Sequence, residues 1–160
     1  MEIVIASGHT VLVDDCDANL VTKTKWHYRA MCRKWYVTRP SGQGKYKRAA
    51  YLHRLITGAG AGQIVDHING NSLDNRRENL RIVDSVQNAR NRAKTSLKTS
   101  SQFKGVCFDS RHKSRPWRAS IRTDEGRKHL GQFATEFEAA KAYDVASRRF
   151  HGEFGRTNFP

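Results

Sequence analysis

Residues 65–81 read VDHINGNSLDNRRENLR, a polar stretch that begins just before an Asp-His pair and ends at Asn-Leu-Arg. Asn, Asp and Gly are typical of turns, so a long surface turn and the wall of an active site both explain this composition. An EF-hand calcium loop is excluded, because it needs oxygen ligands at every second position and a Glu at the twelfth. Counted from Asp66, the third, fifth and twelfth residues are Ile68, Gly70 and Arg77.

The flanks of this stretch predict regular structure. Residues 63–65 have the pattern of a strand that leads into the Asp-His pair, and residues 80–83 have that of its return partner. Asp84 or Ser85 could cap a short helix over residues 86–92. The predicted order is strand, long loop, strand and helix.

Four residues of this segment, Asp66, His67, Asn79 and Asn88, suit phosphodiester cleavage, which needs a base for water and a cation for the phosphate and leaving oxygens. His67 can be the base, since an ordinary imidazole pKa of about 6.5 leaves much of it neutral near pH 7. Asp66 points to the opposite strand face and, with Asn88, offers oxygen ligands, which suit Mg²⁺ or Mn²⁺ better than Zn²⁺. A lone His in a strand is more often structural, so the hypothesis depends on the set.

The set resembles the HNH nucleases of the phage and intron-encoded branch. The matching stretches are HRLI at 53–56, VDHINGNSLDNRRENLRIV at 65–83 and QNARNR at 87–92. The resemblance implies a strand-loop-strand-helix fold around one divalent ion, the ββα-metal fold. In the quoted stretches it implies metal ligands at Asp66 and Asn88, water activation by His67, and a loop-bridging role for Asn79 that orients His67.

Two details of the resemblance qualify it. The last position of the motif is Asn88 where the bacterial toxin branch has His, which favours Mg²⁺ over Zn²⁺. His53 could lie near the site, and packing or phosphate contact is favoured there over catalysis. The polar middle, NGNSLDNRRE at 69–78, is interpreted as turn chemistry, with the function at its edges.

The charge of the chain favours a polyanionic partner. The 160 residues carry a formal net charge of +14 and a sequence pI of about 10.2, with the excess spread over both halves. DNA, RNA and an anionic membrane all fit such an excess. The membrane is disfavoured, because no apolar run approaches the length of a spanning helix and no secretory signal is seen. A nonspecifically solvated basic surface is the plain alternative.

The cysteine residues bear on the cellular compartment of the chain. The three Cys residues are far apart and form no CxxC pair, which argues against a zinc ribbon and a disulfide scaffold. A reducing, cytoplasmic setting in a bacterial or phage-infected cell is expected. A monomer with no obligate protein partner is expected.

Residues 1–60 are predicted to be rich in strands. Strand patterns occur at 11–13 and at 35–38, the latter ended by Pro40-Ser41-Gly42, and residues 50–56 fit either a strand or a short helix. The following Gly-rich segment, 58–62, is a connection rather than a phosphate-binding loop, since no Gly-Lys-Ser/Thr follows it.

Residues 102–160 are predicted to form a second domain, after a first domain at 1–93 and a basic linker, KTSLKTSS, at 94–101. Its strand patterns lie at 103–108, 117–122 and 128–133, with a turn at Asp124-Glu125-Gly126. Thr135 and Glu138 have capping-box spacing, and the helix they open has an apolar stripe of Ala139, Tyr143, Ala146 and Phe150 that ends at Gly152. The fold class is therefore α+β: a β-rich N-terminal region with the nuclease fold (core at 63–93), then a three-stranded antiparallel sheet on one helix.

This domain resembles the DNA-binding domain of plant ethylene-response factors of the Apetala-two type. The matching stretches are FKGVCFDSRHKSRPWRASIR, HLGQFATEFEAAKAYDVASRRFHG and the ending TNFP. That family reads the major groove of DNA with a three-stranded sheet backed by one helix. By position, the side that faces the groove holds Lys104, Arg118, Ser120, Arg122, Arg127 and His129. The full predicted DNA-binding set adds Arg111, Lys113, Lys128, and, near the linker, Arg90, Arg92 and Lys94.

Several residues depart from the plant pattern. Cys107 and Asp109 stand where the plant proteins often have Arg, Ser120 stands for a Glu and His129 for a Trp, and the loop 109–116 is longer. The plant target sequence is therefore not transferred. The two resemblances together imply a site-directed, homing-type endonuclease of double-stranded DNA from a mobile element, and one site per chain predicts that it nicks as a monomer. A transcriptional regulator on an inactive nuclease scaffold and a general RNA-binding protein are the rivals.

Overall fold

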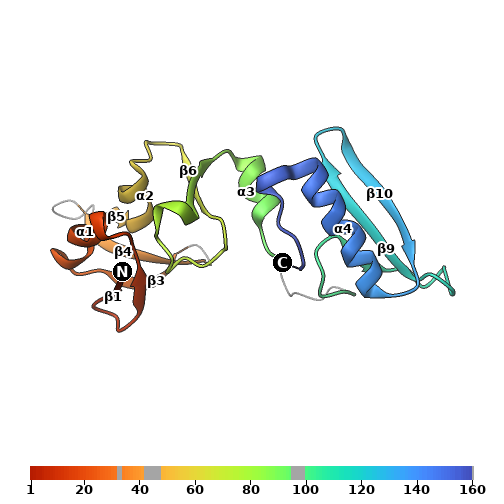
Figure 1. Ribbon diagram of the computed structural model, residues 1–160, viewed down its shortest axis with the longest axis horizontal. Helices are drawn as coiled ribbons and strands as arrows, with labels where there is room; N and C mark the ends of the chain where they lie inside the picture. The colour runs from red at the N-terminus through yellow and green to blue at the C-terminus, as the bar shows by residue number, and fades with distance from the viewer. Residues whose placement is uncertain (32–33, 42–47, 95–99, 160) are drawn as a thin grey trace. The chain divides into compact units, whose positions relative to one another are not determined.

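The computed structural model describes residues 1–31, 34–41, 48–94 and 100–159 (Figure 1). It divides into two compact units, Met1–Ser85 and Val86–Pro160. Both combine small antiparallel sheets with few helices. Of the expected linker, residues 95–99 lie outside the described residues, so the predicted domain limits stay predictions.

The first unit contains three small antiparallel sheets. They are the pair β1–β2, the three-stranded sheet β3–β4–β5 and the pair β6–β7. The strands are β1 (Glu2–Val4), β2 (Thr10–Leu12), β3 (His27–Met31), β4 (Lys34–Ser41), β5 (Arg48–Tyr51), β6 (Ile64–His67) and β7 (Leu80–Val83). The helices are α1 (Ala18–Thr22) and α2 (Leu52–Thr57), with 3₁₀ turns η1 (Asp15–Asp17) and η2 (Arg77–Asn79).

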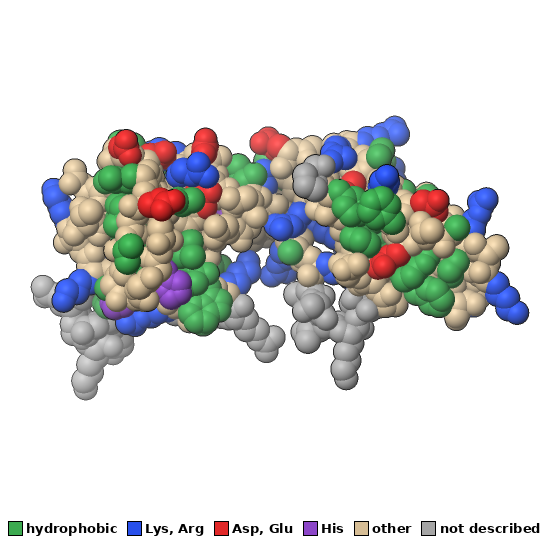
Figure 2. All heavy atoms as spheres, turned by 60° about the horizontal axis from the view of Figure 1, so that its bottom comes forward, with side chains coloured by type: hydrophobic (Ala, Val, Ile, Leu, Met, Phe, Trp, Pro, Cys, Tyr) green, Lys and Arg blue, Asp and Glu red, His purple; other side chains and the backbone are tan. Residues whose placement is uncertain are grey.

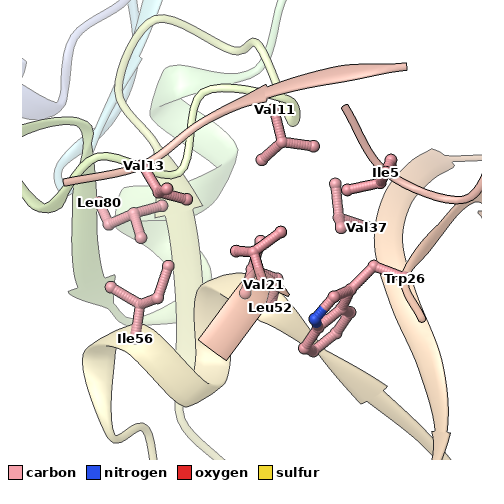
Figure 3. Packing of buried hydrophobic residues seen from close by; sticks show 9 residues of the cluster. All are labelled: Ile5, Val11, Val13, Val21, Trp26, Val37, Leu52, Ile56 and Leu80. Carbon is pink, nitrogen blue, oxygen red and sulfur yellow. The ribbon is translucent and has the colours of Figure 1, made fainter. Parts of the chain in front are cut away.

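One apolar cluster holds the sheets and helices of this unit together (Figure 3). Trp26 is 1% exposed in this cluster, and its indole N–H donates to the carbonyl of Leu20 at 2.8 Å. Leu52 from α2 and Val37 from β4 are buried in the same cluster. The other members are Ile5, Val11, Val13, Val21, Ile56 and Leu80. Leu80 follows the polar loop directly, so the core fixes the start of the return strand.

Two sequence predictions in this unit need adjustment. The strand expected at 35–38 continues as β4 through Pro40 to Ser41, although proline donates no ladder hydrogen bond. Proline is tolerated there because β4 pairs only with β5 beyond Thr38. The ambiguous stretch 50–56 is both strand and helix, because β5 ends at Tyr51 and α2 begins at Leu52.

Helix α3 (Ser85–Asn91) starts at the last residue of the first unit, and its other residues belong to the second unit. The second unit also contains the sheet β10–β9–β8 with a long helix against it (Figure 1). The remaining elements are β8 (Val106–Phe108), β9 (Trp117–Thr123), β10 (Gly126–Phe133), α4 (Glu136–His151) and η3 (Gly152–Phe154). The predicted capping box is present, since Thr135 accepts from the Glu138 N–H and donates its own N–H to the Glu138 carboxylate, both at 3.2 Å. None of the helices in the described parts is long and apolar enough to cross a membrane.

The apolar stripe of α4 packs as predicted. Ala139, Tyr143 and Ala146 are buried against the β9 residues Ala119 and Ile121. The strand expected at 103–108 is shorter, because Gly105 adopts a left-handed turn at a φ of 77° before β8 starts.

Candidate active site and basic sheet face

Strand β6 delivers two polar residues to the interior of the first unit. In the β6–β7 ladder Asp66 pairs with Arg81 and His67 with Leu80, so the two β6 side chains point to opposite faces. Asp66 is 9% exposed and His67 is 7% exposed. A buried carboxylate and a buried imidazole on adjacent residues need polar partners, and the surrounding loop supplies them.

The His67 ring lies between an amide and a second imidazole. Its Nε2 is 3.4 Å from Oδ1 of Asn75, and its ring packs edge-on against His53 at 5.2 Å between centroids. Burial lowers the pKa of His67, while the bond to Asn75 and the negative charges of Asp66 and Asp74 oppose that shift. The positive charge of Lys34 lowers the same pKa further. The ring is therefore neutral near pH 7 and able to accept a proton.

The middle of the loop, residues 69–78, places polar side chains in the interior of the unit. Asn75 and Asp74 are 0% and 2% exposed, and Asp74 accepts two bonds from the Arg76 guanidinium, at 2.9 and 2.8 Å. These bonds hold the pKa of the Asp74 carboxyl below its usual range. Asn69 and Asn71 do form turn bonds, as expected. The turn chemistry predicted for 69–78 is present, and this segment also supplies the contact of Asn75 with His67.

The N-terminal strands buttress the same loop. Leu12 on β2 donates its N–H to the carbonyl of Leu73 at 2.9 Å and accepts from the N–H of Asn75 at 2.8 Å. Asp17 accepts two bonds from the Arg77 guanidinium, each at 2.8 Å, and Asp14 accepts from the Arg77 N–H. Residues distant in sequence therefore fix the position of Asn75.

Asn79 bridges the two ends of the loop. Its side-chain amide donates to the carbonyl of Asp74 at 2.8 Å, and its Oδ1 accepts the N–H of Asn69 at 3.0 Å. The N–H of Ile68 donates to the Asn79 carbonyl at 2.9 Å. These are the bonds of a loop-bridging residue, whereas the contact with His67 Nε2 is made by Asn75, which the sequence analysis did not single out.

Asp66 faces Arg81 across the ladder. Its Oδ2 accepts from Nη2 and Nε of Arg81 at 3.1 and 3.3 Å, and both side chains are only 11–12% exposed. Asn88 is half-buried on α3, in the second unit, so its pairing with Asp66 as a ligand stays a prediction. A carboxylate and an amide are hard oxygen donors, which fit Mg²⁺ or Mn²⁺. Within the described ranges no three His, Cys, Asp or Glu residues gather as a ligand cluster.

Aromatic side chains from β4, β5 and α2 wall the site. The His53 ring lies 5.4 Å from Tyr36, 5.6 Å from Tyr51 and 5.2 Å from His67, between centroids. Burial, with smaller contributions from His67 and Arg54, lowers the pKa of His53 to about 3. A neutral ring that is 6% exposed is placed for packing. The sequence signals for this wall were the strand pattern at 35–38 and the expectation that His53 could lie near the site.

This buried histidine predicts a pH-dependent stability. The unfolded chain binds a proton on residue 53 near pH 6.5, whereas the folded chain does so only near 3. Stability is therefore complete above about pH 6.5 and falls as the pH drops toward 3, by up to about 1.4 kcal/mol per pH unit for this group. Urea denaturation of wild type and His53→Gln between pH 7 and 5 measures this, and equal slopes would contradict it.

A basic face covers the other side of the C-terminal sheet from α4. In the β9–β10 register Arg122 pairs with Arg127, Ser120 with His129, and Arg118 with Gln132. Ala119 and Ile121 point the other way, into the core. A hollow of about 410 Å³ on this face is lined by Asp109, Arg111, His112, Arg118, Ser120, Arg127, His129 and Gln132. Most of the predicted groove-facing residues are thus brought together, with Gln132 added by a bulge after His129.

An aspartate lies in this basic face. Asp109 is 9% exposed and accepts from Nε and Nη2 of Arg111 at 2.8 and 2.7 Å, while Nη1 of Arg118 lies 4.0 Å away. The Arg111 guanidinium holds the pKa of this carboxyl well below its usual range. Asp109 thus orients Arg111 over the hollow. The sequence analysis noted Asp109 only as a departure from the plant pattern.

Six of the predicted DNA contacts lie outside this basic face. Lys128 pairs with Ile121 on the helix side, where its ammonium lies 5.0 Å from the Phe150 ring and 2.7 Å from Glu125. The reason is strand alternation: Arg127, Lys128 and His129 are consecutive and cannot share one face. Lys113 and Arg92 are exposed outside the hollow.

The other three cations tie α3 to the C-terminal sheet. Lys104 donates to the carbonyls of Arg90 and Arg92 at the end of α3, and burial lowers the pKa of its ammonium to about 8. Arg90 pairs with Asp124, and Lys94 donates to the carbonyls of Phe103 and Val106 at 2.7 and 3.0 Å. Carbonyls at a helix end attract cations such as Lys104. All three cations thus make contacts within the second unit.

Comparison with known proteins agrees with both halves of this description. Residues 50–90 match the family model of HNH endonucleases. The chain is 32% identical over 136 residues to an uncharacterized HNH endonuclease, L560, of Acanthamoeba polyphaga mimivirus, covering 78% of this chain and 66% of the viral protein. It is 30% identical over 95 residues to protein 3.8 of Escherichia phage T7, covering 59% of this chain and 75% of that protein.

Plant transcription factors are similar as well. The chain is 32% identical over 156 residues to the AP2-like ethylene-responsive transcription factor CRL5 of rice, covering 87% of this chain. It spans only 24% of the rice protein, which is therefore much longer than the shared region.

Proposed function

Since residues 50–90 form an HNH endonuclease domain and the chain belongs to one family with protein 3.8 of phage T7, we propose that it is a site-directed endonuclease of double-stranded DNA. The observation that carries this proposal is the buried, neutral His67, held by Asn75 in a loop that the rest of the unit braces. Packing alone does not call for such a network of loop bonds around one imidazole.

His67 is the proposed base. With its proton on Nε2, the neutral ring donates to Asn75 Oδ1, and Nδ1 becomes the basic nitrogen that takes a proton from the attacking water. HNH nucleases generally use a divalent metal ion. Asp66 and Asn88 are the proposed ligands and Mg²⁺ the proposed ion, with Mn²⁺ next and Zn²⁺ disfavoured by the oxygen donors. When bound, such an ion neutralises charge on the phosphate and the leaving 3′ oxygen.

The C-terminal sheet is the proposed reader of the target. Arg118, Arg122 and Arg127 stand on one face with the short polar side chain of Ser120, a combination that suits base edges in the major groove. One site per chain predicts a nick by a monomer, acting as a homing-type enzyme of a mobile element in the cytoplasm of a bacterial or phage-infected cell. Duplex DNA is the proposed partner, with no obligate protein partner.

The nuclease is tested on supercoiled plasmids that carry a library of duplex sites. Wild-type protein with Mg²⁺ is expected to relax the plasmid that contains its site and to leave others closed. Binding without relaxation would favour the rival, a transcriptional regulator on an inactive nuclease scaffold. Competition by RNA as strong as by duplex DNA would favour the RNA-binding rival.

The reading face predicts a contrast between two cations that are equally exposed. The side chains of Arg118 and Lys128 are both 40% exposed and lie on adjacent strands but opposite faces. Arg118→Ala is expected to weaken target binding by about 1–3 kcal/mol and relax specificity at one base pair. Lys128→Ala is expected to stay within about 0.5 kcal/mol of wild type. Gel-shift titration measures both, and equal losses would contradict the assignment.

A further inference from the structure

The second face of the β3–β4–β5 sheet is not part of the core of its unit. Val37 points into the apolar cluster, so its neighbours Tyr36 and Thr38 point to the other side. Arg29 lies directly opposite Tyr36 in the ladder, and Lys34 precedes Tyr36 by two residues. Arg29, Lys34 and Tyr36 therefore share one side of the sheet, which we call the β3–β4 face.

This face leads to the catalytic histidine. The ring centroids of Tyr36 and His53 lie 5.4 Å apart, and those of His53 and His67 lie 5.2 Å apart. Lys34 lies near enough for its charge to act on the His67 ring. Within the first unit, the rings of Tyr36, His53 and His67 therefore form a row from the β3–β4 face to the proposed base.

The two cations of the β3–β4 face are available for an anion. Arg29 and Lys34 are exposed, and neither has an ion-pair partner among the residues the structure describes. The carboxylates nearest to His67 are engaged, since Asp66 pairs with Arg81 and Asp74 with Arg76. In the view of Figure 2, both Lys or Arg and Asp or Glu side chains lie on the surface of the first unit. The two exposed cations of the β3–β4 face, with the carboxylates beside His67 already paired, favour a polyanion next to the site.

We propose that Arg29 and Lys34 form a phosphate clamp, which holds the DNA backbone beside the scissile phosphodiester and presents that phosphate to His67. The inference rests on the proposed nuclease function and deepens it. The occupant is the sugar-phosphate backbone of the substrate duplex, because a phosphate must lie beside the proposed base and because Arg and Lys contacts to phosphates fix the position of a protein on DNA. The N-terminal strands thus brace the loop and also contact the substrate.

The clamp is tested by removing charge without removing length. Arg29→Gln and Lys34→Gln are each expected to lower kcat/KM for nicking roughly tenfold to a hundredfold, the range of a hydrogen bond to a charged group. Lys34→Arg is expected to keep near wild-type activity, since it keeps the charge. Lys23→Gln and Lys25→Gln are matched controls, because both are exposed cations of the same unit that lie outside strands β3 and β4, and they are expected to cut like wild type.

Binding gives a second readout that does not depend on cleavage. In a His67→Ala background, the salt dependence of binding to nonspecific duplex DNA is expected to lose about one unit of log–log slope per clamp residue removed. An unchanged slope in the Arg29→Gln, Lys34→Gln double variant would overturn the clamp even if wild type proved unable to nick. Wild type that nicks, with clamp variants equal to the Lys23 and Lys25 controls, would also overturn it.

Discussion

Replacing His67 by Ala is expected to lower the rate of plasmid nicking by about 10²- to 10⁴-fold, the usual contribution of a general base. The ring is the proposed proton acceptor, and burial keeps it neutral, so an alanine leaves water without a base. Target binding is expected to stay nearly unchanged, because the proposed reading face lies in the second unit. The initial rate of nicking at saturating protein measures the first effect, and a gel-shift titration with target DNA measures binding.

Two controls separate chemistry from folding. His9→Ala removes an exposed histidine of the same unit and is expected to cut like wild type. His67→Asn fills more of the buried site than alanine, and it is expected to be equally inactive while unfolding in urea close to wild type. A His67→Ala protein that nicks at the wild-type rate would remove this residue from the mechanism.

Replacing Gly105 by Ala is expected to destabilise the second unit by about 2–6 kcal/mol, from backbone strain and overpacking together. Gly105 has a φ of 77°, where an L side chain is strained. A Cβ there would overlap the ring of Tyr143 and lie 2.8 Å from the carbonyl oxygen of Ser120. The ring cannot retreat, because Tyr143 is 3% exposed in the core under the sheet.

The comparison that isolates the overlap is Gly126→Ala. Gly126 also has a positive φ, 116°, in the same unit, but a Cβ there meets nothing within 4 Å. It is expected to cost only the strain, about 1–3 kcal/mol. Urea denaturation with hydrogen exchange of the C-terminal unit measures both variants. Equal losses would show that the contact with Tyr143 is unimportant, and loss of target binding at 37 °C should accompany only Gly105→Ala.

The elements of this fold were predictable where the determining interactions are local. The capping box of Thr135 and Glu138, the alternation of residues 117–122 and the strand-loop-strand order around residues 65–83 all follow from neighbours in the chain. Alternation also determines that Lys128 leaves the face of Arg127 and His129, and grouping the three by charge overlooked that rule.

Contacts between distant segments were not predictable in the same way. The sequence by itself determined that residues 65–81 join two strands and carry an imidazole and a carboxylate on opposite faces. Tertiary structure decided that Asn75 meets the His67 ring, and that Lys34 of β4 lies near enough for its charge to act on that ring. The physical reason is that burial and long-range pairing set these positions. Strand β2 holds Asn75 by a backbone bond from a residue far away in the sequence. The apolar cluster, whose members come from distant segments, buries Val37 and so turns Tyr36 to the other side of the sheet.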